Sequence, residues 1–297
     1  MGPEDGRALL AVLASRTRFE ERRIFEALER RGVPFQHLDP RALWFDLHGA
    51  PPPYCRAISR ELAHTRALYA ARLLQAKGIP SVNSAAVIQT CGDKLLTSLA
   101  LVAAGLPTPR TAVALSTAGA AEAIEALGYP VVLKPLVGSW GRLAARVRDQ
   151  EAALALLEHR QALPNPQQHV VYAQEHVDKP DRDIRVIVVG DQPLCAMYRV
   201  SRDWRCNVAR GAKPVACPLV GDVAELALLA AKAVGGGVVG VDLLEDRGGG
   251  LRVLEVNHTV EFRALQSVTE LDIADALVAY ALRELGAFQY MAGSAAR

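Results

Sequence analysis

The sequence predicts a mixed α/β (α+β) protein in which a parallel α/β domain at the N-terminus is followed by further units of strands and helices. Short apolar runs typical of strands alternate with segments whose apolar residues recur at helical spacing. The last third of the chain is richer in strands than the first. At a typical size of ~150 residues per domain, a chain of 297 residues contains about two structural units.

The N-terminal part alternates strands with helices. Residues 9–14 form a continuous apolar run, which is typical of a strand buried on both faces. The first helical pattern is ended by Gly32. This alternation predicts a small parallel sheet domain that ends near residues 83–90. Its predicted elements are, in order, strand 9–14, helix 20–31, strand 35–38, strand 55–59 and helix 64–77.

The remaining elements are bounded by glycine and proline. A helix over residues 93–104 is closed by Gly105 and Pro107, and residues 248–250, all glycine, supply a turn between the last two strands. The other predicted helices are 118–127, 150–159, 222–233 and 272–285, and the predicted strands are 111–115, 131–134, 143–147, 170–177, 183–189, 193–200, 240–245 and 251–256.

The composition excludes several classes of protein. The formal net charge of +2 is too small to indicate a nucleic-acid or anionic-membrane partner. The five cysteines form no C-x-x-C pair, as expected of reduced thiols, and the seven histidines have no zinc-ligand spacing. The sequence has neither a signal-peptide pattern nor an apolar stretch long enough for a membrane span. We therefore expect a cytoplasmic protein that binds neither nucleic acid nor membranes.

One candidate phosphate site follows the strand at residues 131–134. Lys134 ends this apolar strand, and a loop that contains Gly138 and Gly141 comes directly after it. Glycines let backbone N–H groups approach phosphate oxygens, and a lysine adds a positive point charge. Taken alone, this pattern is more typical of a solvated strand end.

A candidate metal site lies on two strands near the C-terminus. Asp242 and Glu255 occur within strongly apolar strands, where an unpaired carboxylate would cost several kcal/mol, and Asn257 adds a third oxygen ligand. Such hard oxygen ligands are those that Mg²⁺ takes beside nucleotide phosphates. The alternative is two edge residues that face water. Arg185 and Arg210 are candidate ligands for transferred phosphoryl oxygens, although single arginines are more often surface charges.

Other nucleotide and hydrolase motifs are excluded. Residues 235–240 match G-x-G-x-x-G by letter, but they follow a predicted helix and precede a strand, the reverse of the dinucleotide-binding arrangement. The sequence has no G-x-x-x-x-G-K-[ST] P-loop and no G-x-S-x-G nucleophile elbow.

The order of these features resembles the ATP-grasp superfamily over nearly the whole chain. A more specific resemblance is to the lysine-biosynthesis ligases that load an amino acid onto an acidic amino-group carrier protein, whose wider relatives are ribosomal-protein glutamate ligases. The closer resemblance rests on residues 91–94, 138–142 and 255–262. The general one rests on Lys94, Lys134, the glycine loop, residues 174–177 (Gln-Glu-His-Val), residues 183–186 (Asp-Ile-Arg-Val), Asp242 and residues 255–257 (Glu-Val-Asn).

The resemblance implies an ATP-grasp fold in which two α+β subdomains sandwich ATP. Residues 1–92 would form the N-terminal pre-ATP-grasp α/β domain, residues 93–172 the central lid subdomain, and residues 173–297 the C-terminal subdomain with the metal site. The implied ATP-binding residues are Lys94, Lys134, Gly138, Ser139, Trp140, Gly141, Arg142, Gln174, Glu175, Val177 and Asp183.

The resemblance also implies the chemistry. Asp242, Glu255 and Asn257 would bind Mg²⁺, with Glu255 bridging two ions, and Arg185 and Arg210 would act catalytically on the phosphoryl group. The enzyme would use ATP to activate the C-terminal glutamate of a small acidic carrier protein as an acyl phosphate, which the α-amine of α-aminoadipate then attacks. The family also suggests a homodimer or homotetramer.

Several alternatives remain open. The acceptor could be glutamate, as in the arginine pathway, or the enzyme could add glutamate to a protein tail or a small cofactor. A protein of another class, a degenerate ATP-binding regulator, would be expected to have lost one of the nucleotide or metal residues, and all of them are present.

Two departures from the family concern the substrate. Relatives carry a second glycine where Ala212 follows Gly211, and a costly alanine is expected there if that position has a positive φ. The dipeptide that sorts the family by amino acid is Ala264-Leu265, which matches neither class. Arg199, Arg202 and Trp204 lie on the segment before Arg210, which is expected to be a loop that receives the amino-acid carboxylate or the carrier tail, or else a solvated basic loop. The expected substrate residues are Arg199, Arg202, Asn207, His258, Thr259, Ala264 and Leu265.

Overall fold

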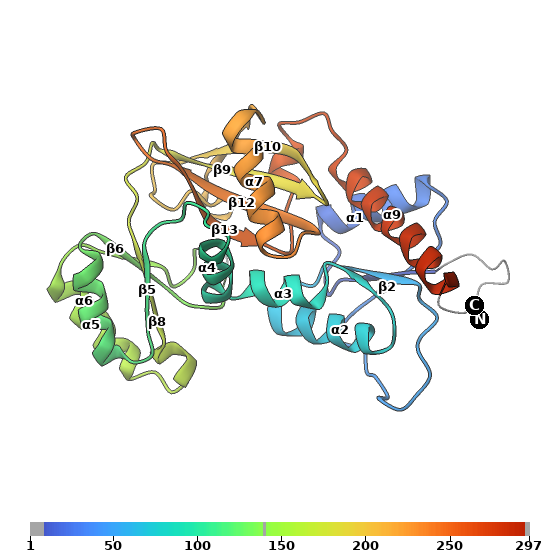
Figure 1. Cartoon of the computed structure of the whole chain (residues 1–297), viewed down its shortest axis with the longest axis horizontal. Helices are drawn as coiled ribbons and strands as arrows, with labels where there is room; N and C mark the ends of the chain where they lie inside the picture. The colour runs from blue at the N-terminus through green and yellow to red at the C-terminus, as the bar shows by residue number, and fades with distance from the viewer. Residues whose placement is uncertain (1–8, 139–140, 295–297) are drawn as a thin grey trace.

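A computed structural model of the chain describes residues 9–138 and 141–294, and their strands form three separate sheets (Figure 1). The first is parallel, and the other two are antiparallel. The mixed α/β class predicted from the sequence is therefore confirmed.

The first sheet has the order β2-β1-β3-β4 and is built from the N-terminal part of the chain. The run Leu10–Leu13 (β1) is apolar throughout because helices cover both of its faces: Leu10 and Val12 pack against Ile24, whereas Leu13 packs against Leu74. The other elements are α1 (Phe19–Arg30), β2 (Phe35–Leu38), β3 (Arg56–Ser59), α2 (His64–Ala76), β4 (Ser81–Val82) and α3 (Ala85–Gly92).

The second sheet, of order β5-β8-β6-β7, forms the lobe at the left of Figure 1. Its two faces differ in character. Val131, Leu133 and Ala173 pack on the helices α5 and α6, whereas Lys134 and Gln174 alternate with them on the opposite face. The elements are β5 (Thr111–Ala114), α5 (Thr117–Leu127), β6 (Val131–Lys134), β7 (Ala145–Val147), α6 (Gln150–Gln161), η1 (Pro166–His169) and β8 (Val171–Glu175).

The third sheet has the order β11-β10-β9-β12-β13. On its central strand β9, Val186 and Val188 face the helix α7, whereas Ile187 and Val189 face the opposite core. The elements are α4 (Lys94–Ala103), which packs against this sheet, β9 (Arg182–Val189), β10 (Gln192–Val200), η2 (Val208–Arg210), β11 (Lys213–Cys217), α7 (Gly221–Ala233), β12 (Val238–Glu245), β13 (Leu251–Asn257), α8 (Arg263–Gln266) and α9 (Ile273–Ser294).

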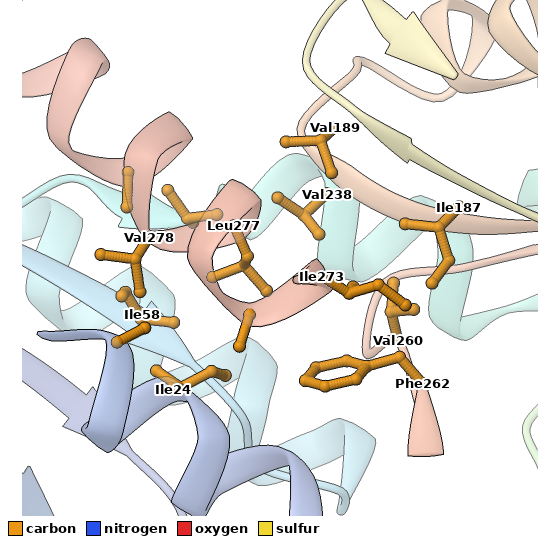
Figure 2. Packing of buried hydrophobic residues seen from close by; sticks show 14 of the residues in the cluster. Ile24, Ile58, Ile187, Val189, Val238, Val260, Phe262, Ile273, Leu277 and Val278 are labelled. Atoms are coloured by element: carbon orange, nitrogen blue, oxygen red, sulfur yellow. The ribbon is translucent and has the colours of Figure 1, made fainter. Parts of the chain in front are cut away.

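A single apolar core joins the first and third sheets. Figure 2 shows side chains from both ends of the chain within it: Ile24 of α1 and Ile58 of β3 lie near Leu277 of α9, together with Val260 and Phe262 from the segment after β13. All five are almost completely buried. The first sheet and α1 are therefore packed directly against the third sheet, whose strands β12 and β13 carry Asp242 and Glu255.

The sequence patterns missed the shorter elements. Helix α3 was not expected because it ends only two residues before α4 begins, and its start depends on Ser84, whose side chain accepts a hydrogen bond from the Val87 backbone N–H. The other missed elements are β4, η1, η2, β11 and α8, all of five residues or fewer. Among the described residues, no single helix has the length and apolarity needed to cross a membrane, although α3 and α4, bent by 102°, pass that test as a pair.

Candidate functional site

Two lysines converge where the second sheet faces the third. Lys134, at the end of β6, donates from Nζ to Gln174 Oε1 at 2.6 Å. Lys94 begins α4, where Asp93 caps the helix by accepting from the Leu95 backbone N–H, and its Nζ donates to the Gly138 carbonyl at 2.7 Å. Lys94, Lys134 and Gly138 line one pocket. The structure thus brings both predicted phosphate lysines to the start of the glycine loop.

The glycine loop adopts a backbone that side chains disfavour. Gly138 and Gly141 have φ values of 151° and 64°. A Cβ at Gly141 would lie 2.8 Å from Asn207 Oδ1, so the loop also approaches the segment after β10 too closely for a larger residue. Gly141 and Arg142 line the pocket. The predicted residues Ser139 and Trp140 lie outside the described part of the chain.

The predicted metal ligands face one another on the third sheet. Asp242 of β12 and Glu255 of β13 are directly opposed in the strand register, so both side chains lie on one face. Asn257 lies two residues beyond Glu255, and its Nδ2 donates to Glu255 Oε1 at 3.2 Å. The alternative of two carboxylates facing bulk water is therefore wrong, since Asp242 is only 1% exposed.

Two arginines on the same face neutralise Asp242. Arg185 is its register partner on β9 and forms a two-bond ion pair with it, of which the Nη2–Oδ2 bond measures 2.9 Å. Arg199 of β10 lies 3.1 Å from Asp242 Oδ2 and donates to both oxygens of Asp183, at 2.6 and 2.9 Å. Arg199 and Asp183 are thus a buried ion pair beside Asp242, and both residues line the pocket.

The pKa values of the two facing carboxyl groups, Asp242 and Glu255, are shifted in opposite directions. Burial raises the pKa of Asp242 to about 6, although the neighbouring arginines oppose the rise. Burial acts the same way on Glu255, but Lys94, Lys134 and Arg185 outweigh it and lower its pKa to about 2. Burial lowers the pKa of Lys134 to about 8 against the attraction of Glu255. At neutral pH, Glu255 is therefore ionised and Lys134 is mostly protonated.

The donor set suits Mg²⁺ bound together with a nucleotide. Asp242, Glu255 and Asn257 present oxygen ligands, and the lysines across the pocket present positive charge for phosphates. In the part of the chain that the structure describes, no group of three or more His, Cys, Asp or Glu side chains could hold a metal alone. Phosphate oxygens and water would therefore have to complete the coordination, as is common for Mg²⁺.

The end of β8 forms another wall of this pocket. The side-chain amide of Gln174 is fully used, because its Oε1 accepts from Lys134 and its Nε2 donates to Thr111 Oγ1 and Tyr172 Oη. Glu175 accepts from Arg252 Nη1 at 2.6 Å. Val177, beyond the end of the strand, lines the pocket. Side-chain contacts of Gln174 thus orient Lys134, and the backbone N–H groups of Glu175 and His176 donate to the carbonyls of Arg110 and Pro130 at 2.9 and 3.1 Å.

Several residues of the same wall were not predicted from the sequence. Lys179 donates from Nζ to the Arg182 carbonyl at 3.0 Å and to Cys206 Sγ at 2.8 Å, and both Lys179 and Cys206 line the pocket. Arg205 lies beside them, with its guanidinium 5.1 Å from the centre of the Trp204 ring. Among these residues, only Lys179 could have been predicted from the sequence, because it is a cation that follows the strand of Gln174 by a few residues.

A second pocket lies beside the first and shares Gly138, Asn207 and Glu255 with it. It is closed by the N-terminal domain, which contributes Leu62 and His64, the latter with its ring 5.9 Å from that of His258. His258 and Thr259, expected from the sequence to bind substrate, lie here. The remaining lining residues are Cys91, Gly92, Val137, Arg185, Asn257 and Glu261.

Four of the predicted residues are not brought into either pocket. Arg202 is exposed, and Arg210, also exposed, lies 3.5 Å from Asp203 instead of near the carboxylates, because η2 turns it outward. Leu265 is 0% exposed within the core below α8, and Ala264 packs against that core. The cost that was expected if Ala212 had a positive φ does not arise, because the positive φ, 93°, belongs to Gly211.

Comparison with known proteins agrees with this geometry. A RimK-like ATP-grasp domain model matches residues 91–281, and a LysX preATP-grasp domain model matches residues 10–90. The glutamate–LysW ligase ArgX of Sulfolobus acidocaldarius is 33% identical over 273 residues, covering 91% of this chain and 97% of that protein. The α-aminoadipate–LysW ligase LysX of Saccharolobus solfataricus is 35% identical over 222 residues, covering 74% of this chain and 81% of that protein. The crystal structure of a RimK domain ATP-grasp protein from Sphaerobacter thermophilus superposes with a TM-score of 0.75 at 29% identity, covering 93% of this chain and all of that one.

Proposed function

The chain belongs to the RimK-like ATP-grasp family of ligases, and from that premise we propose that it joins the α-amine of an acidic amino acid to the C-terminal glutamate of a small acidic carrier protein. ATP and Mg²⁺ are the reagents that the fold uses. The supporting observation is the placement of one carboxylate pair, Asp242 and Glu255, beside two adjoining pockets.

The first pocket suits the nucleotide and its metal. Lys94 and Lys134 would hold the phosphates, with the loop after Gly138 beside them, and the backbone of residues 175–177 would face the base. Asp242, Glu255 and Asn257 would hold Mg²⁺, with Glu255 shared between two ions. When bound, the metal neutralises negative charge between phosphate and carboxylate, which otherwise repel each other.

The residues between the pockets suit the transfer step. Arg185 lines the second pocket while it is held by Asp242, so its guanidinium lies where an anionic group entering from that side would meet the nucleotide pocket. The carboxylate to be activated would bind there and attack the γ-phosphorus of ATP, which gives a bound acyl phosphate and ADP. Attack of the amine on the acyl carbon would then form the amide and release phosphate. The glycine loop would exclude water until the amine arrives.

The second pocket suits the amine acceptor. His258, Thr259 and Asn207 line it next to Arg185, within reach of the border between the pockets. Burial, reinforced by His64 and Arg60, lowers the pKa of His258 to about 4, so its ring is neutral at physiological pH. The neutral His258 ring and the Thr259 hydroxyl would form hydrogen bonds with the α-amino and α-carboxyl groups of the amino acid, and the ring would not repel its ammonium group.

We propose α-aminoadipate as the acceptor, with glutamate as the alternative. A specific observation favours the alternative: the similarity to the glutamate-specific ArgX spans 91% of the chain, against 74% for the aminoadipate-specific LysX. The Ala264-Leu265 dipeptide does not discriminate between them directly, because its side chains lie in or against the core.

The proposal is tested by measuring ADP release from the purified protein with a LysW-type carrier and Mg²⁺, offering α-aminoadipate and glutamate separately, and by mass spectrometry of the carrier. Addition of one amino-acid residue to the carrier is the expected result. Glutamate added to a ribosomal-protein tail in place of the carrier would support the RimK-like alternative. ATP binding without turnover on any of these acceptors would indicate the regulatory alternative and refute the proposal.

A further inference from the structure

The wall of the second pocket is a short irregular segment between β13 and α8. Within residues 259–262 the side chains alternate. Val260 and Phe262 are buried in the core between the first and third sheets (Figure 2), whereas Thr259 and Glu261 line the pocket. A segment outside regular strands and helices depends on side-chain contacts for its position. Two buried polar residues of the N-terminal domain provide such contacts, one at each end.

Asn83 fixes the beginning of this segment. Its Nδ2 donates to the carbonyls of His258 and Val238, each at 2.7 Å, and its Oδ1 accepts from the Val238 backbone N–H at 2.6 Å. The Asn83 side chain is only 4% exposed, so its amide N–H groups and its amide oxygen bond to protein groups and not to water. A Cβ at Gly237 would lie 2.2 Å from Asn83 Oδ1, which explains a glycine at the end of the triplet that precedes β12.

Glu20 fixes the other end. One oxygen of its carboxylate, Oε1, accepts from the backbone N–H groups of Phe262 and Arg263, both at 3.1 Å, and the residue is 5% exposed. Next to it, Arg18 donates from Nη1 to Glu261 Oε1 at 2.6 Å. The start of α1 thus holds both the backbone and the pocket-facing carboxylate of the segment.

We infer that Asn83 and Glu20 are positioning residues for the acceptor pocket, through which the N-terminal domain places His258 and Thr259 for the amino acid. This inference rests on the proposed function. Neither residue lines the first pocket, as far as the chain is described, and the nucleotide lysines are held by separate contacts with Gln174 and Gly138. Displacing the segment should therefore affect the amino acid and spare ATP.

The decisive experiment uses the full-length protein with carrier, ATP and the amino acid that the wild type accepts. Asn83→Asp keeps the shape but removes both donated hydrogen bonds, and Glu20→Leu removes the acceptor. Each should raise KM for the amino acid about tenfold, because a small displacement of a substrate-binding group has large effects, while KM for ATP stays within about twofold of wild type. Glu20→Gln, whose amide oxygen still accepts, should restore most of the affinity.

Two controls separate positioning from general stability. Glu26→Gln removes an exposed carboxylate from the same helix and should leave both KM values unchanged. The melting temperature of every variant is measured in parallel; if Asn83→Asp does not fold, the Glu20 pair decides. Two outcomes would overturn this inference and leave the proposed function intact. One is a lower melting temperature with an unchanged KM for the amino acid, and the other is an equal rise in the KM values for the amino acid and for ATP. A wild-type protein that turns over no amino acid would overturn the proposed function as well.

Discussion

Asp242 and Glu255 face each other across β12 and β13, yet their carboxyl groups are balanced by cations from opposite directions. Arg185, on the same sheet, pairs with Asp242, whereas Lys94 and Lys134 reach Glu255 from across the pocket. Lys134 lies on β6 of the second sheet and therefore reports on how that sheet meets the third, whereas Arg185 and Arg199 report on the third sheet itself. Variants of the two sets should fail in different ways.

Replacing Lys134 with Met should abolish ligation with little loss of stability. The variant removes a positive charge beside the nucleotide site but keeps most of the buried aliphatic stem, and burial already disfavours the charged form. A fall of about 10²–10³-fold in kcat is expected from the loss of one charge-stabilising donor. ADP release and the melting temperature are the measurements. Lys232→Met, on the exposed face of α7, is the matched control, and equal losses in both variants would contradict the assignment.

Replacing Arg199 with Leu should instead destabilise the fold. The change leaves Asp183 without its two charge-assisted bonds and weakens the neutralisation of Asp242, all in a buried setting. Removing one partner of a buried ion pair costs about 3–5 kcal/mol. Denaturant unfolding measures the difference, with Arg202→Leu as the exposed control on the adjoining loop. The additional change Asp183→Leu should recover part of the loss, and a fully stable Arg199→Leu protein would show that this pair is only a substrate contact.

The residues proposed to bind the metal and the nucleotide could be picked out of the sequence because they interrupt an apolar pattern. A carboxylate inside an apolar strand, such as Asp242, or a lysine at a strand end, such as Lys134, stands out against its neighbours. Arg210 was also predicted from its charge, but a single 3₁₀ turn directs its side chain toward Asp203 and not toward the carboxylates of the third sheet. Sequence alone does not show which way an exposed turn points.

The contacts that join the domains carried no such signal. Asn83 contacts His258 across 175 positions, and Glu20 contacts Phe262 across 242. Their partners are backbone groups, which every residue has, so no particular residue type marks the contact in the sequence. The glycines at 235–237 were correctly separated from a dinucleotide motif, but the need for Gly237 arises only from the approach of Asn83.

Replacing Gly141 with Ala should weaken ATP binding. The residue has φ of 64°, and the added Cβ would lie 2.8 Å from Asn207 Oδ1, so either the Asn207 side chain, which lines the same pocket, or the backbone at Gly141 must shift. Gly211→Ala separates the two causes, because its φ is 93° and nothing lies within 4 Å of the added Cβ. Both variants should lose about 1 kcal/mol of stability from backbone strain, but only Gly141→Ala should raise Kd for ATP, measured by calorimetry. Equal Kd values for the two variants would contradict a role of this loop at the phosphates.

Glu21 should make stability depend on pH in the acid range. Its carboxylate is fully buried, and although burial opposes it, hydrogen bonds from Arg18 together with the charge of Arg60 hold its pKa below the ordinary value of 4.5. A carboxyl whose pKa is lower in the folded state stabilises the fold above the unfolded value, and this contribution is lost as the pH falls through the folded value. Glu21→Gln should therefore cost about 2 kcal/mol between about pH 6 and pH 8, because charged partners remain buried.

The same variant should approach wild-type stability below about pH 4.5, where the unfolded wild type takes up the proton first. Urea unfolding of wild type and variant across this range gives the difference directly, and Glu29→Gln, exposed near the end of the same helix, should show no comparable trend. A difference that stayed constant down to about pH 3 would mean that Glu21 contributes through shape and not through charge. The ion pairs at the start of α1 would then fail to explain how the N-terminal domain is held against the pocket.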